Sequence, residues 1–231
     1  MSSLACLLLL LVGLSQSAIL LPLFPLSSDL IEVMAHNEGS GELSTCQDAQ
    51  FNYCQMSFNK FFGLNDSITS RNGSFIFKTV QDYLDLNVTE VTMACSTYAE
   101  FYRCLGRSYH PCTNLNNMLR TTNSNDSNAF DYIRTFRGLE WICTGGFHEV
   151  HNKYDCLQPF PSSMSYRSCL NYFNQTVSTT NFCRSVQQTG DCFNNAYNSA
   201  CGTGSGHFGC GNFRSTFSKS CPGLACMTDD N

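Results

Sequence analysis

"CSTYAEFYRCLGRSYHPC", residues 95 to 112, decides the fold class of this chain. Its apolar residues Tyr98, Phe101 and Leu105 recur at spacings of three and four, the period of one face of an α-helix. Cys95 lies on the same face. Because a short helix is marginally stable alone, a cysteine on its apolar face indicates a helix that a disulfide pins to a neighbour. The stretch therefore predicts a short, crosslinked helix.

Two later stretches repeat this spacing, and no long alternating strand pattern competes with it. Ser127 precedes the first stretch and Gly202 follows the second, and both residue types are common at helix ends. We expect an all-α, disulfide-rich bundle of short helices with an aromatic core; a cofactor site built from the aromatic residues is the alternative. The repeating positions are Phe130, Ile133, Phe136, Leu139 and Cys143 in the first stretch, and Phe193, Ala196, Tyr197 and Ala200 in the second.

The cysteine count supports an oxidising compartment. Of fifteen cysteines, Cys6 lies in an apolar N-terminal leader, which leaves an even set of fourteen. We expect seven disulfides, with a connectivity that the sequence leaves open, and no metal site, because no C-x-x-C pair occurs. The fourteen are Cys46, Cys54, Cys95, Cys104, Cys112, Cys143, Cys156, Cys169, Cys183, Cys192, Cys201, Cys210, Cys221 and Cys226.

The leader predicts secretion. An apolar run from Leu4 to Leu14 is followed by the small and polar residues Ser15, Gln16 and Ser17, as in a secretory signal that is cut near Ser17 or Ala18. We assign residues 1–17 to this signal and expect no membrane segment after its removal. The alternative is an uncleaved anchor, because nothing from Ser2 to Ser28 is charged.

The rest of the chain divides by composition. Residues 18–45 lack cysteine and carry Pro, Ser, Gly and isolated acids, so we expect a flexible arm. A cysteine-rich helical domain follows over 46–226, and 227–231 form a polar tail. Within the domain, the glycine-rich stretch "ACGTGSGHFGCGNF", residues 200–213, is expected to be irregular.

The surface is predicted to be polar and not ionic. Only 13% of the residues are Asp, Glu, Lys or Arg, about half the usual share, and the net charge is −5 with no basic run, which argues against a nucleic-acid partner. N-linked glycans would supply the missing solubility. Five sequons could carry them, at Asn65, Asn72, Asn87, Asn125 and Asn174.

Three motifs suggest chemistry and fail on spacing, on structural context or on residue type. "FHEVHN" holds His148, Glu149 and His151, but zinc proteases need histidines four apart, so we expect a solvated helix surface. "GSGHFG", residues 204–209, matches a dinucleotide-binding pattern, yet no strand precedes it and no clear helix follows. Ser40 has Glu38 and Glu42 where a hydrolase elbow needs glycines. We therefore expect no enzyme, cofactor or metal.

The stretch "EGSGE", Glu38 to Glu42, resembles the sites at which xylose is placed on serine to start a chondroitin chain, in the form found in nematode chondroitin core proteins. The flanking glycines leave the Ser40 hydroxyl unobstructed, and the two acids would hydrate the segment and face a basic enzyme groove. The resemblance makes Ser40 a candidate glycosaminoglycan attachment site. An ordinary linker is the alternative.

Three further stretches, residues 95–112, 139–157 and 192–202, carry a framework of cysteines and aromatic residues. They resemble a secreted family that is abundant in nematodes, called domain of unknown function nineteen, or the related chondroitin proteoglycan type 4 domain. The resemblance would cover most of 46–226.

Together these features favour a secreted glycoprotein that acts without catalysis as an extracellular-matrix or chondroitin proteoglycan core. Its partners would be matrix components or the chondroitin chain itself, and it would act through hydration and charge. The alternative is a secreted module that encloses a lipid in its aromatic core or presents a surface to another protein.

Overall fold

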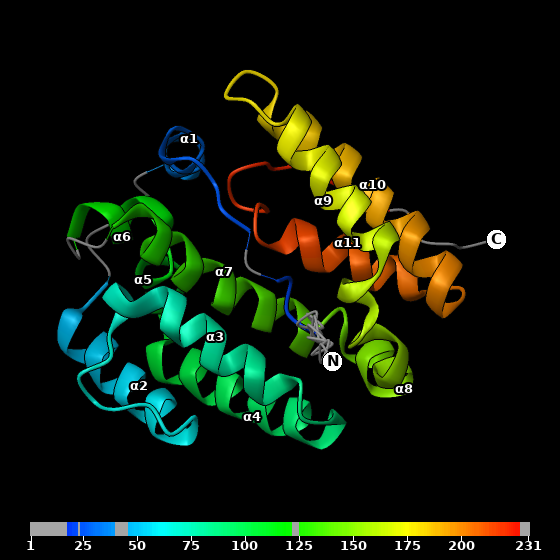
Figure 1. Cartoon of the computed structure of the whole chain (residues 1–231). Coiled ribbons are helices and arrows are strands. Elements are labelled where there is room, and N and C mark those ends of the chain that lie inside the picture. Colours follow the sequence, from blue (N-terminus) through cyan, green and yellow to red (C-terminus); the bar gives the residue numbers. More distant parts are fainter. Residues whose placement is uncertain (1–17, 23, 40–45, 122–124, 227–231) are drawn as a thin grey trace, which may run out of the picture.

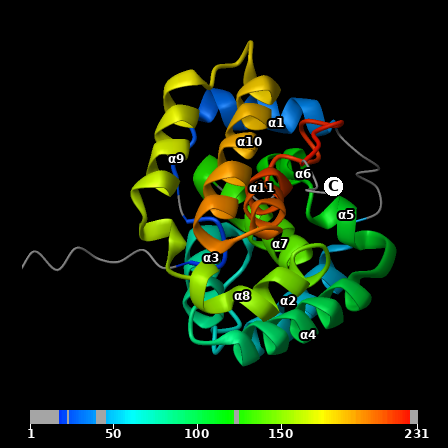
Figure 2. The ribbon, with the colours of Figure 1, turned by 90° about the vertical axis from the view of Figure 1, so that its right-hand side faces the viewer.

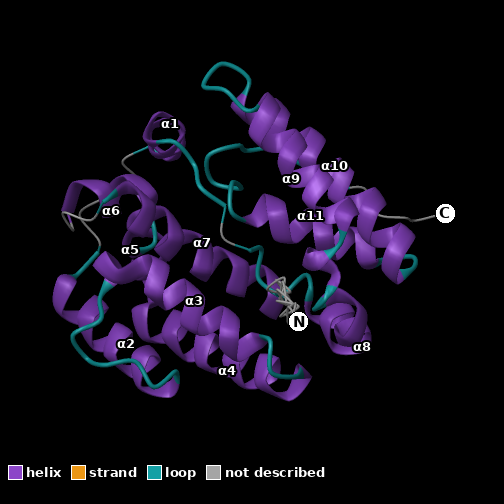
Figure 3. Ribbon diagram, in the orientation of Figure 1, coloured by secondary structure: helices purple, strands orange, loops and turns teal. Residues whose placement is uncertain are grey.

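The computed structural model describes residues 18–22, 24–39, 46–121 and 125–226, and these ranges form helices and no strand. The prediction of an all-α fold is therefore confirmed. The helices are α1 (Ser28–Glu38), α2 (Asp48–Phe61), α3 (Gly73–Leu84), α4 (Val88–Leu105), α5 (Tyr109–Cys112), α6 (Leu115–Thr121), α7 (Asp126–Cys143), α8 (Phe147–Leu157), α9 (Met164–Thr176), α10 (Phe182–Cys201) and α11 (Ser205–Ser215), joined by loops and short 3₁₀ turns (Figure 3).

Helix α4 shows why these sequences fold as predicted. Asn87 precedes it, and its side-chain oxygen accepts hydrogen bonds from the Thr89 and Glu90 N–H groups, which a helix leaves unpaired at its start. Gly106 ends the helix at a φ of 53°, a conformation that favours glycine. Of the predicted apolar face, Tyr98, Phe101 and Leu105 are buried and Cys95 is partly buried. Val91 and Ala94 extend the buried face toward the start of the helix.

The other two predicted stripes belong to α7 and α10. Helix α7 begins at Asp126 behind the capping residue Asn125, and not at Ser127, while Gly202 ends α10 as predicted. Of the α10 positions, Phe193 and Tyr197 are buried, but Ala200 is exposed.

Helix α7 is the centre of the bundle, and it is buried on almost every side. Helices α3 and α4 pack on it from one direction and α11 from another, and α10 covers α11 (Figure 1). Helix α1 lies against α6 and α7 at one end of the bundle (Figure 2). Two groups of helices thus meet along α7.

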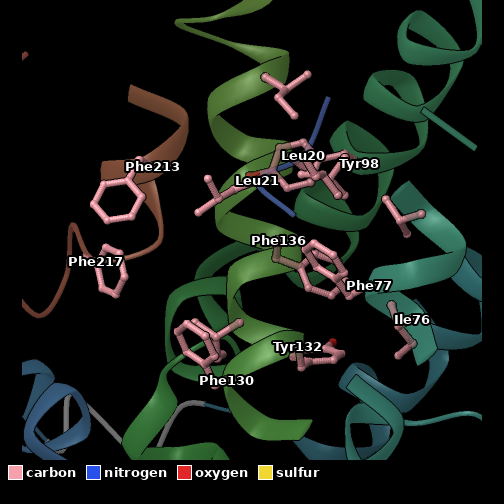
Figure 4. Close-up of a cluster of buried hydrophobic side chains, with 14 of the residues drawn as sticks. Leu20, Leu21, Ile76, Phe77, Tyr98, Phe130, Tyr132, Phe136, Phe213 and Phe217 are labelled. Carbon is pink, nitrogen blue, oxygen red and sulfur yellow. The ribbon is translucent and has the colours of Figure 1, made fainter. Parts of the chain in front are cut away.

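The aromatic side chains form the core, which confirms the packing interpretation. Phe101 and Phe136 stack with ring centroids 4.5 Å apart, and Phe58 lies 5.0 Å from Phe136. On the other side of α7, Phe213 and Phe217 lie 5.2 Å apart (Figure 4). Aromatic rings bury large areas with specific geometry, so these clusters hold the two groups of helices.

All fourteen cysteines outside the leader are paired, which confirms the prediction of seven disulfides. Three bonds lie among residues 46–143 and four among residues 156–226, so each group of helices is crosslinked within itself. The pairs are Cys46–Cys112, Cys54–Cys104, Cys95–Cys143, Cys156–Cys201, Cys169–Cys192, Cys183–Cys221 and Cys210–Cys226.

The expectation of a flexible arm over 18–45 is wrong for residues 18–22 and 24–39. Ile19 and Leu20 are at most 1% exposed, and Phe24 lies within 6.2 Å of Phe130, Phe213 and other core rings. The free energy gained by burying the apolar side chains of this segment exceeds the conformational entropy that the segment loses on ordering. Since Phe24 contacts helices on both sides of the disulfide division, the segment joins the two groups.

Glu38, the last residue of α1, is also part of this packing. Its side chain is 0% exposed and lies 2.8 Å from the guanidinium of Arg137. It also accepts hydrogen bonds from the Leu115 N–H, at the start of α6, and from the Ser220 hydroxyl. The expectation that Glu38 would hydrate a mobile acceptor segment is therefore wrong, because a buried cation holds the carboxylate in the protein.

The glycine-rich stretch 200–213 is not irregular: α10 continues to Cys201 and α11 begins at Ser205. A Cβ at Gly209 would overlap the ring of Tyr197, and one at Gly206 would overlap the backbone of α10. The glycines allow α10 and α11 to approach closely, and the free energy gained from this packing outweighs the low helix propensity of glycine. The motif at 204–209 does open a helix, contrary to expectation.

Candidate functional site

A surface cavity lies between α7, α11 and the C-terminal segment 216–226. It has a volume of about 360 Å³, near the lower end of the range for small-molecule sites. We call it the Trp141 pocket. Its polar and aromatic lining includes Arg137, Glu140, Trp141, His207, Arg214 and Lys219.

Helix packing positions Trp141 at the end of α7. A Cβ at Gly211 on α11, or at Gly145 after α7, would overlap the indole ring, so glycines at both positions make room for it. His207 lies beside it, with ring centroids 5.2 Å apart. The indole therefore forms a fixed, partly exposed wall of the pocket.

Two arginines line the pocket and are already engaged. Arg137 pairs with Glu38 and donates to the Thr216 carbonyl at 2.9 Å. Arg214 donates from Nη1 to the Cys226 sulfur at 3.0 Å. Burial lowers the pKa of Arg214, and the nearby Asp191 carboxylate opposes this shift.

Glu140 and Lys219 are the charges left for a ligand. Among the described residues, neither side chain forms an ion pair. Glu140 is partly buried and Lys219 is exposed. The pocket thus offers one free acceptor group, one free cationic donor and an aromatic wall.

A second, smaller cavity of about 200 Å³ adjoins the first and shares Arg137, Glu140 and Lys219 with it. We call it the Tyr109 pocket; His110 and Asn114 also line it. Burial, and secondly the charge of Lys219, lower the pKa of His110, so this imidazole is neutral at physiological pH. The two pockets are thus neighbours that share Glu140 and Lys219 in their walls.

The serines of this site are not paired with a base in the part of the chain that the structure describes. Ser215 and Ser218 line the Trp141 pocket, but neither hydroxyl bonds to a histidine or carboxylate; both donate to backbone carbonyls. A hydrolytic serine needs an adjacent base. Within the described ranges, no group of three or more His, Cys, Asp or Glu could hold a metal ion.

The residues singled out from sequence lie elsewhere. Ser40 and Glu42 lie outside the described residues. His148 and His151 are exposed on α8, in agreement with a solvated helix surface. All five sequon asparagines are exposed: Asn65, Asn72, Asn87, Asn125 and Asn174.

The predicted glycan sites also have local structural roles. Asn87 caps α4 and Asn125 caps α7, and both use the side-chain oxygen, which leaves the side-chain nitrogen for a glycan. Glycosylation at these sites and modification at Ser40 remain predictions.

Sequence reasoning missed the Trp141 pocket. Trp141 is the single tryptophan of the chain and is followed closely by two glycines, a combination that could have drawn attention to it. The other walls come from α11 and the C-terminal segment, whose placement depends on the tertiary fold.

No known protein family, curated protein or solved structure matches this chain in sequence or fold comparison. The resemblance to the nematode cysteine-rich families thus stays a prediction.

A search of the described helices for one that is long and apolar enough to cross a bilayer finds none.

Proposed function

We propose that this protein is a secreted glycoprotein that acts without catalysis, by binding a small polar molecule in the Trp141 pocket. The observation that carries the proposal is the combination, in one cavity, of a fixed indole wall with the unpaired charges of Glu140 and Lys219. Small-molecule sites typically join an apolar wall to a few convergent polar groups.

Secretion is supported by the covalent chemistry. Seven disulfides indicate an oxidising compartment, since intracellular thiols are kept reduced. The apolar leader and the five exposed sequons agree with export and glycosylation.

The ligand class follows from the lining. The expected ligand has a flat, weakly polar face that packs on Trp141, a hydrogen-bond donor for Glu140 and an acceptor or anionic group for Lys219. A lipid within the core is a poorer candidate, because the gap among Leu20, Phe77 and Arg134 has no room even for a water molecule.

The single tryptophan supplies the experiment. Its fluorescence should change when a library of small polar molecules is titrated against the purified, glycosylated protein, and Glu140→Gln or Lys219→Met should weaken binding about tenfold each, the factor for about 1.4 kcal/mol. Glu149→Gln on α8 is the matched control and should bind as the wild type does. If no compound changes the emission, or if both pocket variants bind normally, the proposal is wrong.

A second function, as a chondroitin proteoglycan core, is favoured by the "EGSGE" stretch around Ser40. Because Glu38 is enclosed, a transferase would have to recognise Ser40 with only Glu42 as a free acid, or act before α1 has packed. Chondroitinase should shift the mobility of the secreted wild type and leave Ser40→Ala unchanged. No shift of the wild type would remove this candidate.

A further inference from the structure

The first described residues make polar contacts that their apolar sequence does not suggest. The Ala18 N–H donates to the Gln158 carbonyl at 2.8 Å, and the Ile19 N–H donates to Asp85 Oδ1 at 2.9 Å. On the other side, the Ile19 carbonyl accepts from the Asn212 side-chain amide at 2.8 Å. Residues 18 and 19 are thus fixed by groups from three separate parts of the chain.

Asp85, directly after α3, is an incompletely compensated carboxylate. Among the described residues it forms no ion pair; the nearby Lys78 pairs with Asp82 at 2.8 Å. Tyr154 of α8, whose hydroxyl donates to the neighbouring Leu84 carbonyl, is the other titratable group that faces it. A cation close to such a partly buried carboxylate would stabilise its charged form.

The pKa of Asp85 reflects this incomplete compensation of its charge. Burial raises the pKa of its carboxyl to about 7, against the lowering effect of the Ile19 hydrogen bond. Asp82 raises the pKa further and Lys78 lowers it. With the Ile19 backbone amide as its hydrogen-bond donor, the group is therefore partly protonated near neutral pH.

The sequence places a potential cation one residue away. Ser15 and Ser17 stand three and one residues before Ala18, the small-residue pattern of a signal cleavage site. Cutting the Ser17–Ala18 bond would turn the Ala18 nitrogen from a neutral amide into an α-ammonium. That nitrogen belongs to the residue directly before Ile19, whose own N–H donates to Asp85 Oδ1 at 2.9 Å.

We propose that leader cleavage occurs at the Ser17–Ala18 bond, and that the Ala18 α-ammonium docks between the Gln158 carbonyl and the Asp85 carboxylate. Water adds across the amide: Ser17 keeps the hydroxyl as a carboxylic acid, and the Ala18 nitrogen takes the hydrogen and a proton from solvent. The signal peptidase supplies the catalysis. Docking completes an ion pair between α3 and the segment that joins the two groups of helices.

The first test is the N-terminus of the secreted protein. Intact mass and N-terminal sequencing should give a chain that begins at Ala18. A chain that begins elsewhere, or that retains the leader, would overturn the proposal.

The second test measures the α-amine itself. In the secreted wild type, cyanate at pH 7 should carbamylate the Ala18 amine about tenfold more slowly than in Asp85→Asn, because a carboxylate partner that raises the amine pKa by one unit removes that factor of reactive free amine. Asp82→Asn, three residues away, is the matched control and should react as the wild type does. Equal rates in the wild type and Asp85→Asn would refute the ion pair.

A third variant covers the case in which Asp85→Asn is not secreted. Inserting Gly-Gln between Ser17 and Ala18 moves the new amine two residues from the docking site while keeping Asp85, and the glutamine, which is not a small residue, keeps the cut after Ser17. This amine should react at the rate of an ordinary peptide N-terminus. A rate as slow as that of the wild-type amine would show that the docking site does not hold the Ala18 ammonium.

Discussion

Removing the carboxylate of Glu38 tests whether α1 is part of the folded core. The carboxylate is 0% exposed and holds three groups: the Arg137 guanidinium at 2.8 Å, the Leu115 N–H at 3.0 Å and the Ser220 hydroxyl at 2.9 Å. In Glu38→Ala, Arg137 stays buried without its counter-ion. The N–H that begins α6 also loses its acceptor.

The magnitude follows from the burial of the pair. Breaking a buried ion pair by removing one partner costs about 3–5 kcal/mol. Because Arg137 still donates to the Thr216 carbonyl, we expect the low end, about 3 kcal/mol. For a protein of this length, that corresponds to a fall in Tm of roughly 6–12 °C.

The assay is thermal unfolding followed by circular dichroism at neutral pH, with disulfides intact. Glu32→Ala is the matched control: it removes the same residue type from an exposed position of the same helix, and should change the free energy of unfolding by no more than about 0.5 kcal/mol. If Glu38→Ala and Glu32→Ala unfold at the same temperature, α1 does not contribute a buried ion pair and the described packing is wrong.

Four further outcomes are expected. Replacing Cys54 and Cys104 together by alanine should lower the free energy of unfolding in urea by about 3 kcal/mol, because the enclosing Cys46–Cys112 bond leaves a closed loop of roughly 16 residues; no loss would contradict this bond. Gly73→Ala should lower Tm, because the added Cβ would overlap the Asn128 carbonyl where α3 packs on α7. This overlap should outweigh the helix-propensity gain of about 1 kcal/mol, and a higher Tm would refute the close contact between α3 and α7. Asn87→Ala should lower the free energy of unfolding by about 1 kcal/mol, and Asn87→Asp should lower it much less, because aspartate still caps α4. Both variants remove the glycan, so equal losses would assign the effect to the glycan. With Gly-Gln inserted before Ala18, the pKa of Asp85 stays raised by burial above its unfolded value, so the free energy of unfolding should fall as pH rises from about 4 to 7. Asp85→Asn in the same background should remove that contribution, and an identical pH profile in both variants would refute it.

The helices with a strong stripe could be predicted because periodicity is a local property. Tyr98 and Phe101 on α4 show it directly, and the even cysteine set required no structural knowledge. The pairing could not be predicted, since Cys54 meets Cys104 only because α2 packs on α4.

The packing of segment 18–39 could not be predicted from composition, because its apolar start merges with the leader. Leu30, Ile31, Met34 and Ala35 do have helical spacing, and their burial on α1 shows that this signal was present in the sequence. The surrounding proline, serine and glycine residues, which are typical of loops, obscure this helical pattern.

The glycines of α11 mislead for a different reason. A sequence reports the conformational freedom of Gly209, but not the aromatic ring of Tyr197 that only a glycine accommodates. The Trp141 pocket is hidden in the same way, because α7, α11 and the C-terminal segment meet only after folding.

Peptide mapping of the secreted, unreduced protein by mass spectrometry is the most direct test of the conclusion that the fold consists of two groups of helices, each crosslinked within itself. We expect seven linked peptide pairs, with three bonds confined to residues 46–143, four confined to residues 156–226, and no free thiol. A bond that joins the two ranges, or thiols that alkylate before reduction, would contradict it.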